Sequence, residues 1–196
     1  MGCASSTQSS AVVDSKQKPN GNYPVYGNAN IMTRRSHGTS NTPVQKDLRW
    51  GCDFQTADRI CNYNRHFAEP SGYLRGKNRF LQECESAKRK KTTVKFYDSN
   101  TGNLLFEAPK NRSMDDFLRE SKQHGWPSFR DSEVNWEHVR CLRGGEAVSL
   151  AGTHLGHNLP DHQGNRYCIN LVSVAGRSRG NEEEEPKESA NVDAGN

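Results

Sequence analysis

The stretch HLGHNLPDHQGNRYCINL, residues 154 to 171, decides both the fold and the chemistry that this sequence predicts. Its second half alternates in character, as a strand does when its two faces meet different surroundings. Two sets of side chains would then face opposite ways: Arg166, Cys168 and Asn170 on one face, and Tyr167, Ile169 and Leu171 on the other. The pattern predicts a strand with one face for packing and one face for chemistry.

Cys168 is the side chain on the polar face that can act as a nucleophile. The guanidinium of Arg166, two residues away on the same face, favours the thiolate, which is the nucleophilic form. His154 and His157 lie upstream, and Asp161 follows His157 by four residues, so a proton donor and a group to orient it are at hand. The alternative is a small buried hydrophobic side chain, the usual role of a cysteine on a strand.

Composition limits how much of the chain folds. Only 32% of the 196 residues are hydrophobic and the mean hydropathy is −0.98, which is low for a chain that is folded throughout. Ser, Asn, Gly and Pro dominate residues 5–44, and a polar, acidic stretch follows residue 181. We therefore expect a disordered tether over residues 1–47, one domain over residues 48–176 and a disordered acidic tail over residues 177–196.

Charge and cysteine content narrow the class of protein. The formal charge is only +4, and the basic run at residues 88–91 is typical of a solvated connection, so we expect no nucleic-acid binding. No apolar run approaches the roughly 18 residues that a membrane span needs. The six cysteines follow no secretory segment, which predicts free thiols in a reducing, cytoplasmic setting. We expect a monomer.

The first six residues, MGCASS, fit an N-myristoylation pattern on Gly2. Cys3 beside it is a natural palmitoylation site. Because a single myristoyl chain binds a membrane only marginally, a second acyl chain on Cys3 would make the attachment stable. We therefore expect a lipoprotein tethered to a membrane face, the alternative being an ordinary flexible N-terminus.

Short strands predominate in the middle of the chain. Strands are indicated at residues 94–97, 104–106, 136–142, 147–150 and 165–174, and short helices at residues 56–63, 79–85 and 113–124. The last helix has Ser113 as its cap and ends before Gly125. Many short strands with few helices predict a mainly β, β-rich α+β fold built on antiparallel sheets.

Three separated motifs resemble the methionine-R-sulfoxide reductases, the B type with a SelR-like domain, in the order of that family. They are GWPSF at residues 125–129, HLGH at residues 154–157 with Asp161 following, and RYCIN at residues 166–170. The similarity spans about residues 53–176 and is strongest after Gly125. It implies two packed antiparallel sheets with a few peripheral short helices.

The resemblance also implies a reaction. Cys168 would attack the sulfur of methionine-R-sulfoxide while His157 gives a proton or hydrogen bond to the oxygen, leaving methionine and a sulfenic acid. Arg166 would stabilise the thiolate, and Asp161 would orient the polar side. Substrate binding would fall to four residues: Trp126 and Phe129 on the apolar side, and His154 and Asn170 on the polar side. The partners would be oxidised proteins or free methionine-R-sulfoxide.

The sequence departs from the zinc-binding members of that family. Those members carry two Cys-x-x-Cys pairs, at positions that correspond here to Asp98 and Thr101 and to Val148 and Ala151. None of these four side chains replaces a thiolate ligand. We therefore expect no structural zinc, no other metal and no bound cofactor.

Recycling of the sulfenic acid needs another thiol. Some family members carry it directly before the Gly-Trp pair, where this chain has His124. We take Cys141, inside the best-matched region, as the candidate resolving cysteine, while Cys52, Cys61 and Cys84 stay open. Reduction by an external thiol reductant such as thioredoxin is expected either after such a disulfide or directly on Cys168.

Two functions of other classes are also compatible with the sequence. One is a noncatalytic, membrane-tethered domain that binds methionine segments, oxidised or not. The other is a thiol redox sensor, in which Cys168 reports oxidant to a partner without turning over a sulfoxide. Turnover of a sulfoxide would distinguish the reductase from both.

Overall fold

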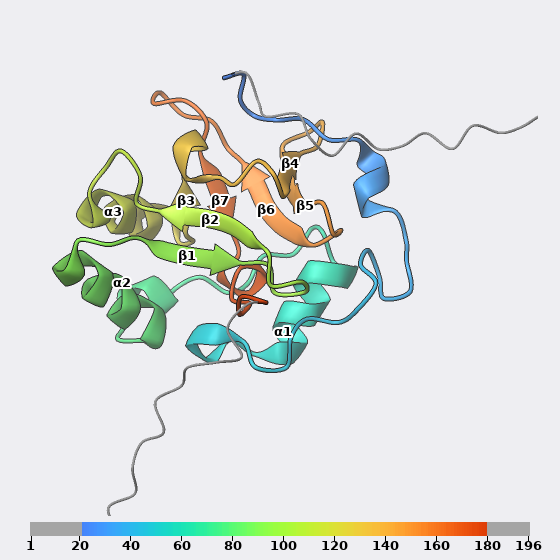
Figure 1. Ribbon diagram of the computed structural model, residues 1–196, viewed down its shortest axis with the longest axis horizontal. Helices are drawn as coiled ribbons and strands as arrows, with labels where there is room; N and C mark the ends of the chain where they lie inside the picture. Colours follow the sequence, from blue (N-terminus) through green and yellow to red (C-terminus); the bar gives the residue numbers. More distant parts are fainter. Residues whose placement is uncertain (1–20, 180–196) are drawn as a thin grey trace, which may run out of the picture.

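Two antiparallel sheets form the middle of the molecule in the computed structural model, which describes residues 21–179 (Figure 1). The larger sheet has five strands in the order β3 (Ser128–Phe129), β7 (Tyr167–Ile169), β6 (His154–Asn158), β5 (Glu146–Ser149) and β4 (Val139–Cys141). The smaller sheet is a hairpin of β1 (Val94–Tyr97) and β2 (Leu104–Ala108). The predicted β-rich α+β fold with two packed antiparallel sheets is confirmed.

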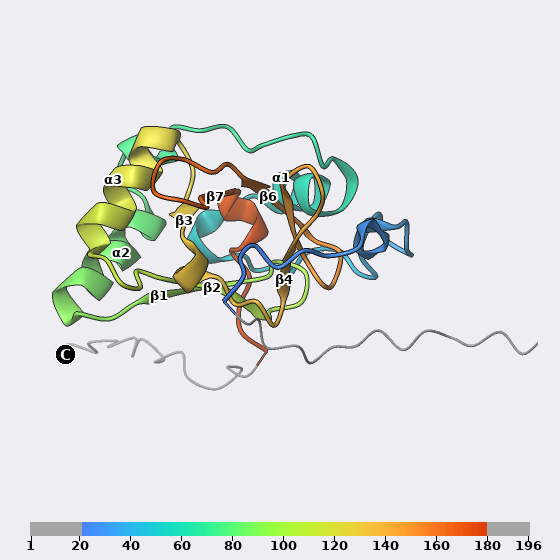
Figure 2. The same ribbon diagram turned by 90° about the horizontal axis from the view of Figure 1, so that it is seen from above.

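Three α-helices lie around these sheets within the described residues. They are α1 (Phe54–Asp58), which continues as a π-helical turn (Arg59–Tyr63), α2 (Arg79–Lys90) and α3 (Met114–His124). Short 3-10 turns occupy Ala29–Met32, Arg49–Gly51, Tyr73–Arg75, Asp131–Glu133 and Leu171–Ser173. Figures 1 and 2 show α2 and α3 together at one end of the molecule and α1 toward the other. None of the helices in residues 21–179 is long and apolar enough to cross a bilayer.

The predicted elements are largely where the sequence places them. The helix predicted at residues 79–85 continues to Lys90, because its basic last turn favours the negative end of the helix dipole. In α3 the Ser113 hydroxyl and the Asp116 carboxylate bond each other's backbone amides in a capping box. The helix ends at Gly125 with a φ of 89°, a left-handed turn that favours glycine. The strand at residues 154–158 was not predicted.

An aromatic cluster holds the two sheets together. Phe129 of β3 stacks on Phe106 of β2 with ring centroids 4.3 Å apart, and meets Phe96 of β1 edge-on at 4.9 Å. Phe117 of α3 packs beside them, 5.5 Å from Phe129. All four side chains are fully buried. The core therefore lies between the hairpin, α3 and one face of the larger sheet. The opposite face of β7 is not part of this core.

Residues 21–47 contradict the predicted disordered tether. The Gly27 amide donates to the Cys141 carbonyl (2.8 Å) and the Cys141 amide donates to the Val25 carbonyl (2.9 Å), which extends the larger sheet beside β4. Met32 and Val44 are buried against the domain. The polar composition gave the wrong prediction, because a few spaced apolar side chains are enough to order a segment that packs against an already folded domain. The predicted tail over residues 177–196 is bound to the domain at its start, where the Arg177 amide donates to Oε1 of Gln45 (2.6 Å). Gly2, Cys3 and residues 180–196 lie outside the described residues.

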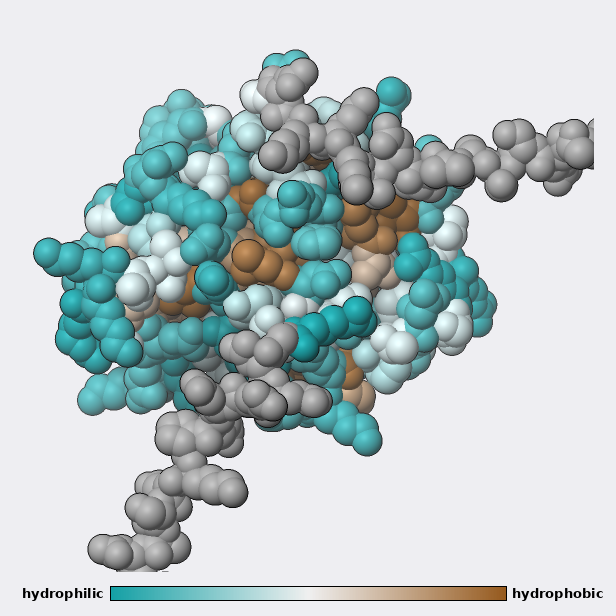
Figure 3. Space-filling view, viewed as in Figure 1, coloured by the Kyte–Doolittle hydropathy of each residue, from teal (hydrophilic) through white to brown (hydrophobic). Residues whose placement is uncertain are grey.

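The surface is largely hydrophilic. On the face drawn in Figure 3, apolar residues show only as separate patches between polar ones. This matches the low mean hydropathy of the chain, −0.98. The apolar side chains that the domain does have are concentrated in its interior.

Candidate active site

Cys168 occupies the middle of β7, between β3 and β6. Its partners across the two antiparallel ladders are Ser128 on β3 and His157 on β6. Directly opposed residues of antiparallel strands project from the same face of the sheet, so these three side chains share one face. Tyr167 and Ile169 point the other way and are fully buried in the core. The predicted alternation along this strand is confirmed.

The close approach of β6 to β7 depends on Gly156. Its φ is 155°, and a Cβ atom there would overlap the carbonyl oxygen of Cys168. The glycine of the HLGH stretch therefore brings His157 within pairing distance of the strand that carries the cysteine.

A cavity of about 390 Å³ opens over this face of the sheet. Its polar lining comes from Arg65, His66, His154, His157, Cys168 and Asn170, and its apolar lining from Trp126, Phe67, Ala68 and Leu159. Phe67 and Leu159 are 41% and 46% exposed, so they form the outer rim. The cavity thus has a nucleophile and imidazoles on one side and aromatic rings on the other.

Burial and a hydrogen bond hold His154 in place beside His157. It is 1% exposed, and its Nδ1 lies 2.8 Å from Oε1 of Glu146, which the Arg65 guanidinium also binds. Burial, the largest influence, raises the pKa of Glu146, but hydrogen bonds from His154 and Arg65 outweigh it and lower the pKa to about 2. A charged carboxylate therefore fixes the imidazole of His154, whose ring meets that of His157 edge-on, with centroids 5.7 Å apart.

His157 is half-buried, which disfavours the charged form of its imidazole. Burial lowers its pKa below the usual 6.5, and the charge of His154 lowers it further, against the opposing effect of Glu146. A neutral imidazole can still donate a hydrogen bond and relay a proton. These are the two actions that the sequence predicted for this residue.

The electrostatics of Cys168 differ from the sequence prediction. Burial is the largest influence and raises the pKa of the thiol; Arg166 lowers it, and Glu69 raises it again. The expectation of a favoured thiolate is therefore wrong in its net direction. The spacing along the strand indicated that the guanidinium is near. It could not show that the sulfur is buried, or that the carboxylate of Glu69, about 100 residues upstream, lies close by.

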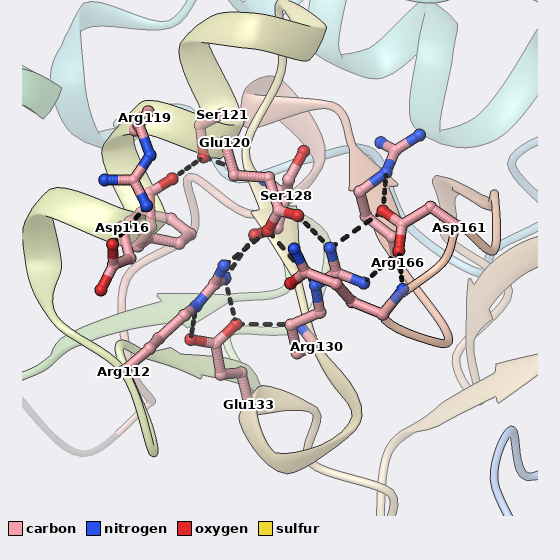
Figure 4. A network of polar contacts seen from close by, with 12 residues as sticks. Arg112, Asp116, Arg119, Glu120, Ser121, Ser128, Arg130, Glu133, Asp161 and Arg166 are labelled. Carbon is pink, nitrogen blue, oxygen red and sulfur yellow. Dashed lines mark hydrogen bonds and ion pairs between the residues drawn. The ribbon is translucent and has the colours of Figure 1, made fainter.

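Arg166 and Asp161 lie in an ion-pair network beside the cavity rather than in its lining (Figure 4). Asp161 accepts hydrogen bonds from Arg130 at 3.0 and 2.9 Å, and its Oδ2 is 3.4 Å from Nε of Arg166. The hydrogen bond from Arg130, the largest influence, lowers the pKa of Asp161. Glu120 binds Arg130 and Arg112 on the other side. Asp161 thus contacts Arg166 and does not line the cavity.

Glu69 fastens a loop over the end of β7. Its buried carboxylate accepts hydrogen bonds from the backbone amides of Leu171 (2.6 Å) and Val172 (3.0 Å) and from the Tyr73 hydroxyl (2.6 Å). Burial, the largest influence, raises the pKa of this carboxyl against those three hydrogen bonds. The same residue therefore acts on the loop and on the electrostatics of the cysteine.

The backbone of Glu69 positions two predicted substrate-binding residues. Its carbonyl accepts from Nε1 of Trp126 (3.0 Å), and its amide donates to Oδ1 of Asn170 (3.1 Å). Asn170 in turn donates through Nδ2 to the Leu155 carbonyl (3.2 Å). The indole N–H of Trp126 is thus hydrogen-bonded to the Glu69 backbone, and its ring lines the cavity. Asn170 mainly links the backbones of Glu69 and Leu155.

Besides Asp161 and Arg166, two further predicted site residues do not line the cavity. Phe129 pairs with Tyr167 in the β3–β7 ladder and shares its core-facing side, so the prediction that it binds substrate is wrong. Cys141 is fully buried on β4, three strands from β7, which corresponds to about 14 Å. A disulfide tolerates about 7 Å between Cα atoms. The prediction of Cys141 as the resolving cysteine therefore does not fit this fold.

Sequence reasoning missed several residues that build the site. Arg65 and Glu146 orient His154, Phe67 and Leu159 form the rim, and Glu69 holds the loop. The one visible signal was the Glu-Pro pair in the turn-rich stretch at residues 68–73. The contribution of Glu146 depends on its pairing with His157 across β5 and β6, and the sequence does not show this register.

The positions that carry zinc ligands in the resembled family do not fit zinc. Asp98 is fully buried and accepts from the Asn100 amide (2.9 Å) and the Thr153 hydroxyl (2.8 Å). Val148 packs in an apolar cluster with Met32. Oxygen and hydrocarbon groups therefore stand where thiolates would be needed. Within residues 21–179, no three His, Cys, Asp or Glu side chains gather in a way that suits a metal ion.

The site therefore combines one half-buried thiol, one neutral imidazole opposite it and an aromatic wall. These groups come from β7, from β6 and from the turn after α3, and Glu69 ties the last of them to the end of β7. The chain matches no protein-family model, no curated protein and no solved structure.

Proposed function

We propose that this protein reduces methionine-R-sulfoxide to methionine, with Cys168 as the nucleophile. The observation that carries the proposal is the direct pairing of Cys168 and His157 at the floor of a cavity walled by Trp126. The resemblance of the three motifs supplies the substrate and its stereochemistry. The geometry supplies a thiol, a hydrogen-bond donor and an apolar surface on one site.

The reaction is a transfer of one oxygen atom. The sulfur of Cys168 attacks the sulfoxide sulfur, whose oxygen takes the thiol proton by way of the neutral His157. The oxygen then bonds to the sulfur of Cys168 while its bond to the substrate sulfur and the new sulfur–sulfur bond both break, so that methionine leaves reduced by two electrons and Cys168 becomes a sulfenic acid. Because the thiol brings its own proton, the raised pKa of Cys168 is compatible with this balance.

The apolar side of the cavity suits the rest of the substrate. Sulfur and methyl groups pack well on aromatic rings, and Trp126 and Phe67 offer such rings. Arg65 and Glu146 are paired with each other, so this pair is not free to bind the ammonium and carboxylate of a free amino acid. We therefore propose methionine sulfoxide within a polypeptide as the preferred substrate, with its neighbours against the rim.

The electrostatics favour the reductase over a thiol redox sensor. Sensor cysteines react directly with small oxidants and have lowered pKa values and good access to solvent. Cys168 is half-buried, and its pKa is raised. Such a thiol is better suited to a substrate that the cavity holds against it.

Turnover with separate stereoisomers tests the proposal. Purified protein with dithiothreitol should reduce the R isomer of a methionine sulfoxide peptide and leave the S isomer unchanged. Cys168→Ser should abolish the reaction, whereas Cys84→Ser, buried on α2, should keep it. Absence of turnover of either isomer by the unaltered chain would contradict the proposal.

Two further expectations accompany this function. Acylation of Gly2 and Cys3 would attach the protein to the cytoplasmic face of a membrane, and a thioredoxin-like protein would supply the electrons for each cycle. Mass spectrometry of the protein isolated from its own cells would test the first. The second expectation concerns how oxidised Cys168 is returned to the thiol.

A further inference from the structure

The described cysteines differ in accessibility. Cys61, Cys84 and Cys141 are fully buried, whereas Cys52 and Cys168 are partly exposed. A sulfenic acid on Cys168 can condense with a thiol that reaches it. Accessibility alone therefore singles out Cys52 among the candidates.

Cys52 and Cys168 also border the same pair of side chains, Glu69 and Tyr73, which are joined by a hydrogen bond of 2.6 Å. Burial raises the pKa of both cysteines, and the charge of Glu69 raises each of them further. Burial and Glu69 raise the pKa of Tyr73, and the charges of Cys52 and Cys168 add to this. Because such interactions fall off with distance, both thiols lie near this one hydrogen-bonded pair.

The backbone just before Cys52 is bound to the segment that follows β7. Arg49, three residues earlier, donates its amide to the Ala175 carbonyl at 2.8 Å. Cys52 packs at the junction of two apolar clusters, one of which contains Leu171 and the other Val172. These are the residues whose amides bind Glu69.

The segment before Cys52 is a sharp connection rather than a regular element. Trp50 and Gly51 both have left-handed backbone angles, with φ of 60° and 74°, and Asp53 caps α1 directly afterwards. A left-handed angle at a bulky residue such as Trp50 is strained. Cys52 therefore sits on a short joint between two anchored segments.

We propose that Cys52 is the resolving thiol that attacks the sulfenic acid of Cys168, an inference that rests on the proposed function. The Cys52 sulfur forms a bond to the Cys168 sulfur while the sulfur–oxygen bond of the sulfenic acid breaks. The hydroxyl leaves with the Cys52 proton as water, and an external dithiol later reduces the disulfide.

The remaining cysteines fit this role less well. Cys141 lies three strands away with its side chain on the core face. Cys61 is fully buried and donates its thiol to the Ser173 hydroxyl at 3.5 Å. Cys84 is buried on the core side of α2.

A single turnover without reductant tests the inference. The full chain is mixed with an excess of an R-sulfoxide peptide, alkylated and digested, and its disulfides and methionine product are measured by mass spectrometry. The unaltered chain and Cys141→Ser should both yield a Cys52–Cys168 disulfide. Cys52→Ser should form methionine but no disulfide, and dimedone should trap Cys168 as a sulfenic acid. A Cys168 disulfide to any other cysteine, or dimedone labelling of the unaltered chain equal to that of Cys52→Ser, would overturn the assignment.

A parallel sample separates this inference from the proposed function. The chain is oxidised with one equivalent of hydrogen peroxide, which forms the sulfenic acid without any sulfoxide. A Cys52–Cys168 disulfide in this sample with no methionine in the first would reject the reductase and keep the pairing of the thiols. Methionine formation in the first sample with no such disulfide in either would reject Cys52 and keep the reductase.

Discussion

His157 lies directly opposite Cys168 in the antiparallel pairing of β6 and β7, so the imidazole and the thiol project from the same face of the sheet. The glycine beside His157 permits this approach, and the ring of His157 packs against the buried His154, which Glu146 binds. The relationship places an imidazole next to a thiol. It leads to the first prediction.

Replacing His157 should slow the chemical step more than it weakens binding. We expect His157→Gln to lower kcat about 100-fold, the lower end of the range for general acid–base catalysis, with little change in KM. Steady-state kinetics with an R-sulfoxide peptide measures both. The matched control is His162→Gln, an exposed histidine in the following loop, which should leave kcat unchanged. An unaltered kcat in His157→Gln would remove this residue from the mechanism.

The rim of the cavity should distinguish peptides from the free amino acid. Removing the half-exposed ring of Phe67 costs about 1 kcal/mol of apolar contact, so KM for a sulfoxide peptide should rise about fivefold. Free methionine sulfoxide, which does not reach the rim, should be affected less. Phe54→Ala, which removes another exposed ring at the start of α1, should change neither KM. Equal effects of Phe67→Ala on both substrates would argue against a rim that binds polypeptide.

The reactivity of Cys168 toward an alkylating agent should follow its raised pKa. Because burial keeps the thiol protonated, its alkylation rate should go on rising with pH above the usual range of a cysteine. Arg166→Met removes a charge that lowers the pKa, so its midpoint should move to still higher pH. Peptide mass spectrometry after brief iodoacetamide treatment at several pH values gives both midpoints.

The control for that experiment is Arg143→Met, an exposed arginine in the turn between β4 and β5. Its midpoint should match that of the unaltered chain. A midpoint for the unaltered chain below the usual range of a thiol would show that Arg166 outweighs burial, as the sequence alone suggested.

Two glycines offer a matched test of the β6–β7 approach. Gly156→Ala adds a methyl group that overlaps the Cys168 carbonyl, and should destabilise the fold by about 3 kcal/mol or more. Gly164→Ala has a φ of 108° but open space around the added carbon, and should cost only about 1 to 2 kcal/mol. Urea denaturation gives both free energies of unfolding. Similar losses of stability in the two variants would mean that the backbone angle, and not contact with Cys168, is the reason why residue 156 must be glycine.

The sequence predicts much of the fold because local patterns suffice for it. The alternation around Cys168, the capping box of α3 and the turn-rich β1–β2 hairpin each depend on residues near one another in the chain. The strand β6 has no alternating apolar pattern and exists because β5 and β7 pair with it on both sides. Its prediction would have required knowledge of the sheet order.

Only part of the site could be predicted from the sequence, because several of its contacts depend on how the strands pair. Cys168, His157 and Trp126 meet at the cavity as expected, but Phe129 faces the core because the register of β3 pairs it with Tyr167. Cys141 seemed close in sequence, although three strand spacings separate it from β7. The buried carboxylate of Glu69 and the half-buried carboxylate of Glu146 both contact parts of the site, and no local sequence pattern indicates these contacts.

The most direct test of the central claim is the stoichiometry of one turnover at Cys168. The unaltered chain is mixed with an R-sulfoxide peptide in the absence of reductant and in the presence of dimedone, and both products are measured by mass spectrometry. We predict one methionine per chain and an equal amount of Cys168 converted to a dimedone adduct or a disulfide. Absence of methionine, or methionine formed while Cys168 remains a free thiol, would contradict the account.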